Sequence, residues 1–283
     1  MENTKTTIYR PLECRPDSYQ SWYQQGNRLR EDQLYPEALM CYEKALEYYP
    51  NDYWAWYKKG MTLEELGRYE EAVVSYENAA NIEPNNYWSW YDKGCIHLEE
   101  LQEYENAINC FKQALSIYSN DYWAQYRIAE AYRLGENYSE AIAAYDQALT
   151  IRPNDYWAWY RRGDCLRHQG NLEEALGNYE KALLVKPNDY WGWYQKGKLL
   201  QQLNRFDEAI NCYQKALDAE PNDEYAWYHQ SHCHAALNNE DEAINCLLEA
   251  LDIAPNMMLK LAKNNEIFNS YWQSDRLSEF LDE

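Results

Sequence analysis

The sequence has no Cys-x-x-Cys pair, no glycine-rich phosphate loop and no uninterrupted apolar run that approaches eighteen residues. The missing apolar run argues against a membrane-spanning helix, so we expect no membrane insertion. The eight cysteines are scattered, which favours reduced thiols over a disulfide framework and indicates a cytoplasmic location. The first residues also lack the basic start and apolar core of a signal peptide, in agreement with that location.

Positive charge is scarce as well. The chain holds 26 Lys and Arg against 47 Asp and Glu, which gives a net charge of −21. A strongly acidic protein is repelled by phosphate backbones and by anionic membranes, so we expect no nucleic acid partner. The charge favours solubility and basic or neutral partners. Hydrophobic residues make up 46% of the sequence, which is enough to bury a core.

Signals for catalysis are missing too. There is no nucleophile elbow, and paired acids such as Glu173 and Glu174 are expected at helix starts on the outside. Four neighbouring residues resemble metal ligands: His229, His232, Cys233 and His234. Because only the first two share a helix face, we expect no metal site. The sequence therefore predicts a protein that is not an enzyme and needs no cofactor.

Aromatic residues are abundant, with 29 Tyr and 12 Trp, and they belong to a repeat. The stretch Pro-Asn-Asp-Tyr-Trp-Ala-Trp-Tyr begins at Pro50. Similar stretches begin at Pro84, Ser119, Pro153, Pro187 and Pro221, with a degraded copy at Pro16. The spacing is 34 residues, except for 35 between Pro84 and Ser119, where the extra residue falls between Gly94 and Leu101. A fixed period of this length is typical of solenoid proteins.

Each copy predicts two amphipathic helices. Small or apolar residues three to four apart form the buried stripes: Trp56, Gly60 and Leu63 in the first helix, then Ala72, Tyr76 and Ala79 in the second. Gly67 is expected to end the first helix. Glu70 opens the second, where an acid suits the positive end of the helix dipole, and Pro84 follows its end.

This pattern resembles the tetratricopeptide repeat (TPR) family from Tyr19 to Pro255. Alanine recurs where two helices cross closely: Ala38, Ala72, Ala107, Ala141, Ala175, Ala209 and Ala243, and one turn later Ala45, Ala79, Ala114, Ala148, Ala182, Ala216 and Ala250. The departures are Gln125 for Trp, Ala129 and Ser231 for Gly, and Ser119 for Pro.

The resemblance implies an all-α, right-handed superhelical solenoid of seven helical hairpins with a C-terminal capping helix region. The expected order is an N-terminal extension over 1–18, seven repeats and a cap over 255–283, with repeats at 19–52, 53–86, 87–121, 122–155, 156–189, 190–223 and 224–254. The tail carries apolar residues, among them Phe268, Trp272, Phe280 and Leu281, that would cover the open end of the last hairpin.

In TPR proteins one flank of the first helices lines a concave groove that binds partner peptides. Carried over copy by copy, this flank holds two aromatic ladders: Trp54, Trp88, Trp123, Trp157 and Trp191, and Tyr23, Tyr57, Tyr91, Tyr126, Tyr160, Tyr194 and Tyr228. The fold does not require the five tryptophans, and a contiguous aromatic strip is typical of a contact surface. The alternative is that the indoles stack on one another and on neighbouring tyrosines, which would stiffen the superhelix.

Two equivalent motifs place arginines beside an acid on this flank. They are Arg127-x-x-Glu130-x-x-Arg133 and Arg161-x-x-Asp164-x-x-Arg167. Either each motif is a self-satisfied set of ion pairs, or its surplus arginines bind an acidic side chain or a C-terminal carboxylate. The charge on the flank is polarised: repeats one to three carry two positive and five negative residues, and repeats four and five carry four and two. The carboxylate clamp of chaperone-binding TPR proteins is not reproduced.

The sequence thus predicts an adaptor or scaffold that binds another protein. An extended, proline-rich or amphipathic helical segment, with or without an acidic group, would suit the aromatic flank. Three alternatives stay open: a self-assembling structural solenoid, a regulatory or assembly-factor subunit of an enzyme complex, and single-stranded RNA binding, which the acidity disfavours.

Overall fold

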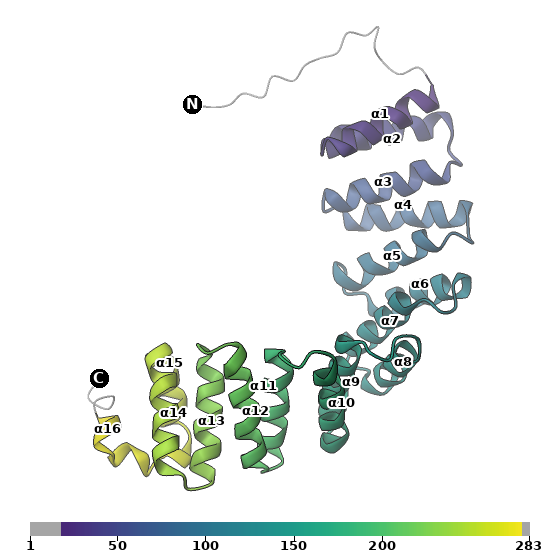
Figure 1. Cartoon of the computed structure of the whole chain (residues 1–283). Helices are drawn as coiled ribbons and strands as arrows, with labels where there is room; N and C mark the ends of the chain where they lie inside the picture. Colours follow the sequence, from purple (N-terminus) through teal and green to yellow (C-terminus); the bar gives the residue numbers. More distant parts are fainter. Residues whose placement is uncertain (1–17, 279–283) are drawn as a thin grey trace, which may run out of the picture. The chain divides into compact units, whose positions relative to one another are not determined.

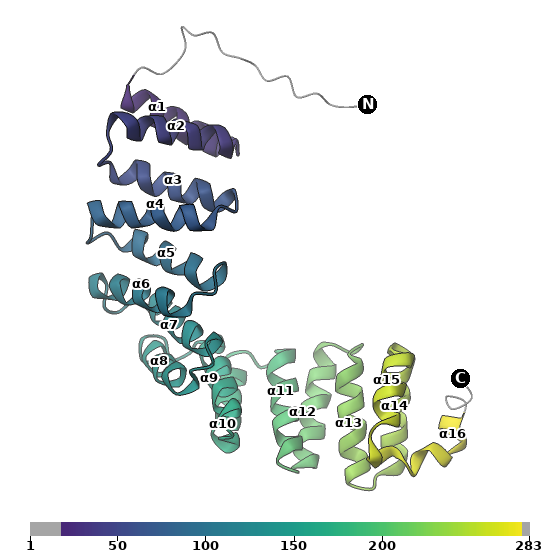
Figure 2. The ribbon, with the colours of Figure 1, turned by 180° about the vertical axis from the view of Figure 1, so that it is seen from behind.

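The computed structural model describes residues 18–278, and every regular element in that range is a helix. The helices fall into two compact units, one ending at Glu136 and one beginning at Asn137 (Figures 1 and 2). Each unit is described by itself. The prediction of an all-α fold made of consecutive helical hairpins is confirmed. Within the described part of the chain, no helix is both long and apolar enough to cross a bilayer.

Unit 1 contains three hairpins followed by one further helix. Figure 1 shows the hairpins stacked in chain order, each made of a shorter first helix and a longer second helix. The helices are α1 (Tyr19–Glu31), α2 (Tyr35–Tyr48), α3 (Tyr53–Glu65), α4 (Tyr69–Ile82), α5 (Tyr87–Glu99), α6 (Tyr104–Ile117) and α7 (Tyr122–Leu134).

Unit 2 begins with a single helix, continues with three hairpins and ends in short helices. Its elements are α8 (Tyr138–Ile151), α9 (Tyr156–His168), α10 (Leu172–Val185), α11 (Tyr190–Gln202), α12 (Phe206–Ala219), α13 (Glu224–Ala236), α14 (Glu240–Ile253), α15 (Pro255–Lys263), η2 (Glu266–Phe268), η3 (Tyr271–Gln273) and α16 (Asp275–Ser278).

The helix boundaries follow from local chemistry. Every first helix starts after a residue whose side-chain oxygen accepts a backbone N–H of the first turn, such as Asp52 with Ala55 N at 2.6 Å. Gly67 ends α3 at a φ of +69°, as predicted, because a left-handed residue closes the helix there. The extra residue of the third repeat lies in the turn Glu100–Glu103, where His97 Nδ1 contacts Glu103 Oε2 at 2.7 Å.

Each hairpin closes where a small residue of the first helix meets an aromatic ring of the second. A methyl group added at Gly60 would lie 2.9 Å from the Tyr76 ring, and at Gly94 it would lie 2.8 Å from Phe111. This confirms that small residues mark the close crossing of the two helices. The cysteines predicted to pack in the second helices, such as Cys41 and Cys212, are buried and unpaired.

A second indole in most repeats ties the first helix to the preceding turn. The Nε1 of Trp159 donates to the Pro153 carbonyl at 2.8 Å, and the same bond recurs for Trp56, Trp90, Trp193 and Trp227 with the proline six residues earlier. The repeat that lacks this tryptophan has Gln125, and it also lacks the proline, which is Ser119. The two departures from the repeat therefore fall at the two positions that this hydrogen bond joins in the other repeats.

We predict that Trp159→Phe lowers the free energy of unfolding by about 1 kcal/mol, because the ring is kept and one hydrogen bond is lost. Trp157→Phe is the matched control, since that neighbouring indole is exposed. Urea denaturation followed by circular dichroism measures both. Equal losses in the two variants would contradict a structural role for the Trp159 hydrogen bond.

The C-terminal elements cover the last hairpin. Met258, Phe268, Tyr271 and Leu277 are buried against α13 and α14, in one cluster with Leu247. The predicted cap residues Phe280 and Leu281, and most of the N-terminal extension, lie outside the described residues.

His229 lies inside this end of unit 2. Its ring stacks on Tyr213 at 5.6 Å, and burial, followed by the charge of Lys198, lowers its pKa from 6.5 to about 4. An unfolded chain therefore takes up this proton at a higher pH than the folded chain does. The stability tied to the neutral ring is complete above pH 6.5 and is lost as the pH falls towards 4.

We predict that the urea midpoint of the wild type falls between pH 7 and about pH 4.5, and that His229→Phe falls less over the same interval. The phenylalanine keeps the stacking and cannot be protonated. His168→Phe, at an exposed histidine, controls for the loss of a titrating ring. Identical pH profiles for wild type and His229→Phe would refute the role of His229.

Candidate functional site

Five tryptophans at the second position of consecutive first helices are exposed to solvent. Their exposed fractions are 50% for Trp54, 56% for Trp88, 51% for Trp123, 43% for Trp157 and 55% for Trp191. We call these residues the indole strip, with Trp54, Trp88 and Trp123 in unit 1 and Trp157 and Trp191 in unit 2. Large apolar rings left in water at the same place in five consecutive repeats are not explained by packing.

Each indole is held by tyrosines of its own helix. Trp157 meets Tyr156 edge-on at 5.0 Å and Tyr160 at 5.9 Å, and Trp54 meets Tyr53 and Tyr57 in the same way. Among the described residues, no ring contact joins Trp54 to Trp88 or Trp157 to Trp191. These indoles therefore rest on tyrosines and not on one another, and each remains 43–56% exposed.

The tyrosine ladder is less exposed than the indole strip. Tyr57, Tyr91 and Tyr126 are half-buried, whereas Tyr160 and Tyr194 are buried. The last two pack against Tyr179 and Tyr213 of the second helices, at 5.6 and 6.0 Å. Tyr160 and Tyr194 therefore expose little surface and support the neighbouring indoles, and their contact with a partner stays a prediction.

A hydrogen bond between neighbouring repeats positions the strip. The Tyr87 hydroxyl donates to Asp121 at 3.0 Å, and the same carboxylate caps α7 by accepting Ala124 N at 2.7 Å. Tyr156 likewise donates to Asp189, which caps α11. Burial and this bond raise the pKa of Tyr156. We call this contact the tyrosine–cap bond; it fixes the residue immediately before Trp88 and the one immediately before Trp157.

The hydrogen bond between the second and third repeats has different partners. The cap residue of the third repeat is Asn86, and the hydroxyl of Tyr53 instead accepts a hydrogen bond from Ser89 at 3.1 Å. Ser89 occupies the position that is alanine in four other repeats, at Ala55, Ala124, Ala158 and Ala226. Sequence reasoning missed these bonds, although the recurring pair of an acidic cap and a following tyrosine was their signal.

The arginines of the first motif are paired within unit 1. Arg127 lies 2.6 Å from Glu99, and Arg133 contacts both oxygens of Glu130, at 3.0 and 2.8 Å. A cavity of about 310 Å³ beside them is lined by Leu98, Glu99, Gln102, Tyr104, Arg127, Glu130 and Leu134. The self-satisfied ion-pair interpretation fits these two arginines.

The second motif is more loosely paired. Arg161 and Arg167 lie 3.5 and 3.6 Å from Asp164, and the Tyr179 hydroxyl donates to the same carboxylate at 2.8 Å. Arg161 also lies over the Trp157 ring, 5.7 Å from its centre. Two cations thus share one acid beside an exposed indole.

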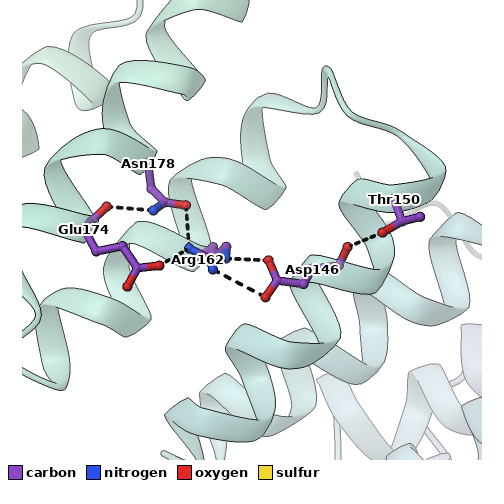
Figure 3. Close-up of polar contacts among 5 residues, drawn as sticks. All are labelled: Asp146, Thr150, Arg162, Glu174 and Asn178. Carbon is purple, nitrogen blue, oxygen red and sulfur yellow. Dashed lines mark hydrogen bonds and ion pairs between the residues drawn. The ribbon is translucent and has the colours of Figure 1, made fainter.

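Arg162, the next residue, turns to the other side of α9. It contacts Asp146 at 2.8 Å, Glu174 at 3.1 Å and Asn178 at 3.1 Å, and so joins α8, α9 and α10 (Figure 3). Its side chain is only 13% exposed. With its hydrogen bonds made internally, Arg162 is a structural residue.

We predict that Arg162→Gln destabilises unit 2 by about 1–3 kcal/mol, because it leaves the buried Asn178 side chain without this partner and removes the ion pairs to Asp146 and Glu174. Arg161→Gln removes the same charge from the adjacent position and changes the stability by less than about 0.5 kcal/mol. Thermal denaturation of both variants tests this contrast. If the two melt together, Arg162 has no special structural role.

The predicted absence of a metal site is compatible with the local packing. His232 Nδ1 lies 3.0 Å from Gln201 Nε2, and Cys233 is buried. Within residues 18–278, no three His, Cys, Asp or Glu side chains are grouped so that they could hold a metal ion.

Stacked helical hairpins with a periodic exposed strip define a helical-repeat protein. Models of the tetratricopeptide repeat match residues 41–74, 89–121, 122–155, 156–189 and 194–257. The chain therefore belongs to the tetratricopeptide repeat family. No curated protein sequence matches the chain.

Solved structures show the same fold. The C-terminal part of a TPR repeat-containing protein from Cytophaga hutchinsonii is 17% identical, with a TM-score of 0.71 over 92% of this chain and 99% of that one. MamA from Desulfovibrio magneticus is 21% identical, with a TM-score of 0.55 over 61% and 97%. YrrB, a TPR protein with an unusual peptide-binding site, is 23% identical, with a TM-score of 0.58 over 67% and 98%.

Proposed function

We propose that this protein is a non-catalytic scaffold that binds a segment of another protein on its indole strip. A general role in protein interaction is supported by the repeat family and by its structural neighbours. The observation that carries the finer proposal is the exposure of Trp54, Trp88, Trp123, Trp157 and Trp191. The exposed part of each indole ring does not contribute to the packing of the hairpins. Its regular presence therefore points to a ligand.

The geometry suits an extended segment. Each indole is fixed edge-on by two tyrosines, so little side-chain entropy is lost on binding. Along α3, α5 and α7 in unit 1, and along α9 and α11 in unit 2, the rings recur once per repeat. Apolar or proline side chains of an extended partner can stack on such rings, while the indole N–H groups donate to its backbone carbonyls.

Self-assembly through the strip is the main alternative. It would bury the same rings against a second copy, but two chains of net charge −21 repel each other. Light scattering over a concentration series distinguishes the two, because a protein that stays monomeric at high concentration has its strip free for a partner.

We predict that peptides selected from a random display library by the wild-type protein bind Trp157→Ala/Trp191→Ala at least about 30-fold more weakly, since interface tryptophans are frequent hot spots. The double variant keeps its helicity and melting temperature, because both side chains are exposed. Fluorescence anisotropy of the selected peptides measures the affinities.

Val74→Ala/Leu184→Ala is the matched control. Both residues are exposed apolar side chains on second helices, 55% and 81% exposed, and lie away from the strip. Peptides that bind both double variants as tightly as the wild type, or a library that yields no binder, would rule out the indole strip as the binding surface.

A further inference from the structure

The indole strip does not carry the same charge in every repeat. In the second repeat, the surroundings of Trp54 include Lys58, and the charges of Glu83 and Asp92 act on the neighbouring Tyr53. In the fifth repeat, the positions of Glu64 and Glu83 are taken by Arg167 and Lys186, and that of Lys58 by Arg161. The same hairpin forms with acidic residues at two of these positions around Trp54 and with basic residues there around Trp157. The basic residues are therefore not required for packing.

Two cations lie directly against the Trp157 ring. The Arg161 guanidinium is 5.7 Å from the centre of the indole, and the Lys186 ammonium is 5.4 Å from it. Lys186 comes from the end of α10 and also covers Tyr156 at 4.6 Å. Lys198, on α11, lies 5.7 Å from Tyr194. The exposed indole of Trp157 is thus bordered by positive charge from α9 and from the end of α10, and Lys198 adds a cation beside Tyr194 of the next repeat.

These cations are poorly neutralised by the protein itself. The nearest carboxylate to Arg161 is Asp164 at 3.5 Å, which is longer than a good ion pair. In the described part of the chain, no carboxylate lies within ion-pair distance of Lys186 or Lys198, whereas Lys196 on the other side of α11 pairs with Glu180 at 3.0 Å.

The two acids nearest to this surface are already engaged. Asp164 accepts the Tyr179 hydroxyl and is shared with Arg167. Asp189 accepts the Tyr156 hydroxyl and caps α11 through Gly192 N at 3.0 Å. Arg161, Arg167 and Lys186 are thus three cations beside two engaged acids, in a chain whose net charge is −21.

We propose that the surface formed by Trp157, Arg161 and Lys186 in unit 2 recognises a partner segment whose carboxylate side chains alternate with proline or aliphatic residues. The proposal rests on the function proposed above and adds the chemistry of the ligand. The apolar residue stacks on the free face of Trp157, and the carboxylate takes the guanidinium of Arg161 and the ammonium of Lys186.

An acidic protein segment fits this surface better than a nucleic acid does. A segment with a few carboxylates matches the few cations beside Trp157 that lack a close carboxylate partner within the protein. An oligonucleotide would bring a phosphate with every nucleotide, and the phosphates beyond this surface would meet a protein of net charge −21. Stacking on tryptophan is shared by the two ligands, so the charges decide between them.

The test compares labelled peptides on the full chain by fluorescence anisotropy. The probes are three repeats of Glu-Pro-Leu-Pro, the same peptide with Gln in place of Glu, and the same with Lys. We expect the Glu peptide to bind the wild type about ten-fold more tightly than the Gln peptide and the Lys peptide to bind most weakly, with a preference that shrinks as salt is raised.

Arg161→Gln/Lys186→Gln abolishes the preference for Glu over Gln, and both peptides then bind equally. Lys181→Gln/Lys215→Gln is the matched control, because it removes two positive charges that lie over Trp159 and Trp193 instead, and it keeps the preference. Circular dichroism checks that both variants are folded. Trp157→Ala weakens the Glu and Gln peptides alike.

Three results would overturn the inference. They are equal binding of the Glu and Gln peptides by the wild type, no binding of any of the three, and a preference that survives Arg161→Gln/Lys186→Gln. Labelled decauridylate that binds as tightly as the Glu peptide and is lost in that variant would assign the surface to nucleic acid. The library selection decides separately whether the indole strip binds peptides, so either idea can fail alone.

Discussion

The close contact between a glycine of the first helix and an aromatic ring of the second, made in five repeats, determines how the hairpins of this protein are built. At Gly60 and Gly197 the ring of the second helix leaves no room for a β-carbon. Because the two helices lie this close, their facing sides are filled, and the opposite side of the first helix is turned outwards. The positions of Trp54 and Trp191 fall on that outer side. The exposure of the indoles is therefore a geometric result of how the hairpin closes.

Much of this arrangement can be read from the sequence. The helix boundaries, the small residues at the crossings and the exposure of the five tryptophans all depend on residues close together in one repeat, where helical periodicity is a sound guide. The burial of Tyr160 could not be predicted from this periodicity. Periodicity assigns it to the same flank as Trp157, but its burial depends on Tyr179 in the second helix, and thus on how closely the two helices approach.

The contacts between neighbouring repeats could not be predicted from the sequence either. Arg161 and Arg162 are adjacent and chemically identical, yet one has a loose contact with Asp164 and the other bridges three helices. One residue is a step of about 100° around a helix, which separates a solvent-facing side from a packed side. Net charge is a similarly coarse guide, since the average of −21 conceals a basic surface around Trp157.

The tyrosine–cap bond has a consequence for how such an array can change its length. Tyr156 completes its bond with Asp189, a residue that lies one period further along the chain and caps the next first helix. Tyr87 and Asp121 are related in the same way. Gain or loss of one whole period therefore supplies or removes a donor and an acceptor together. The gene for such a protein can duplicate or delete a complete repeat and still leave every first helix capped, whereas a deletion of half a period leaves a buried hydroxyl without a partner.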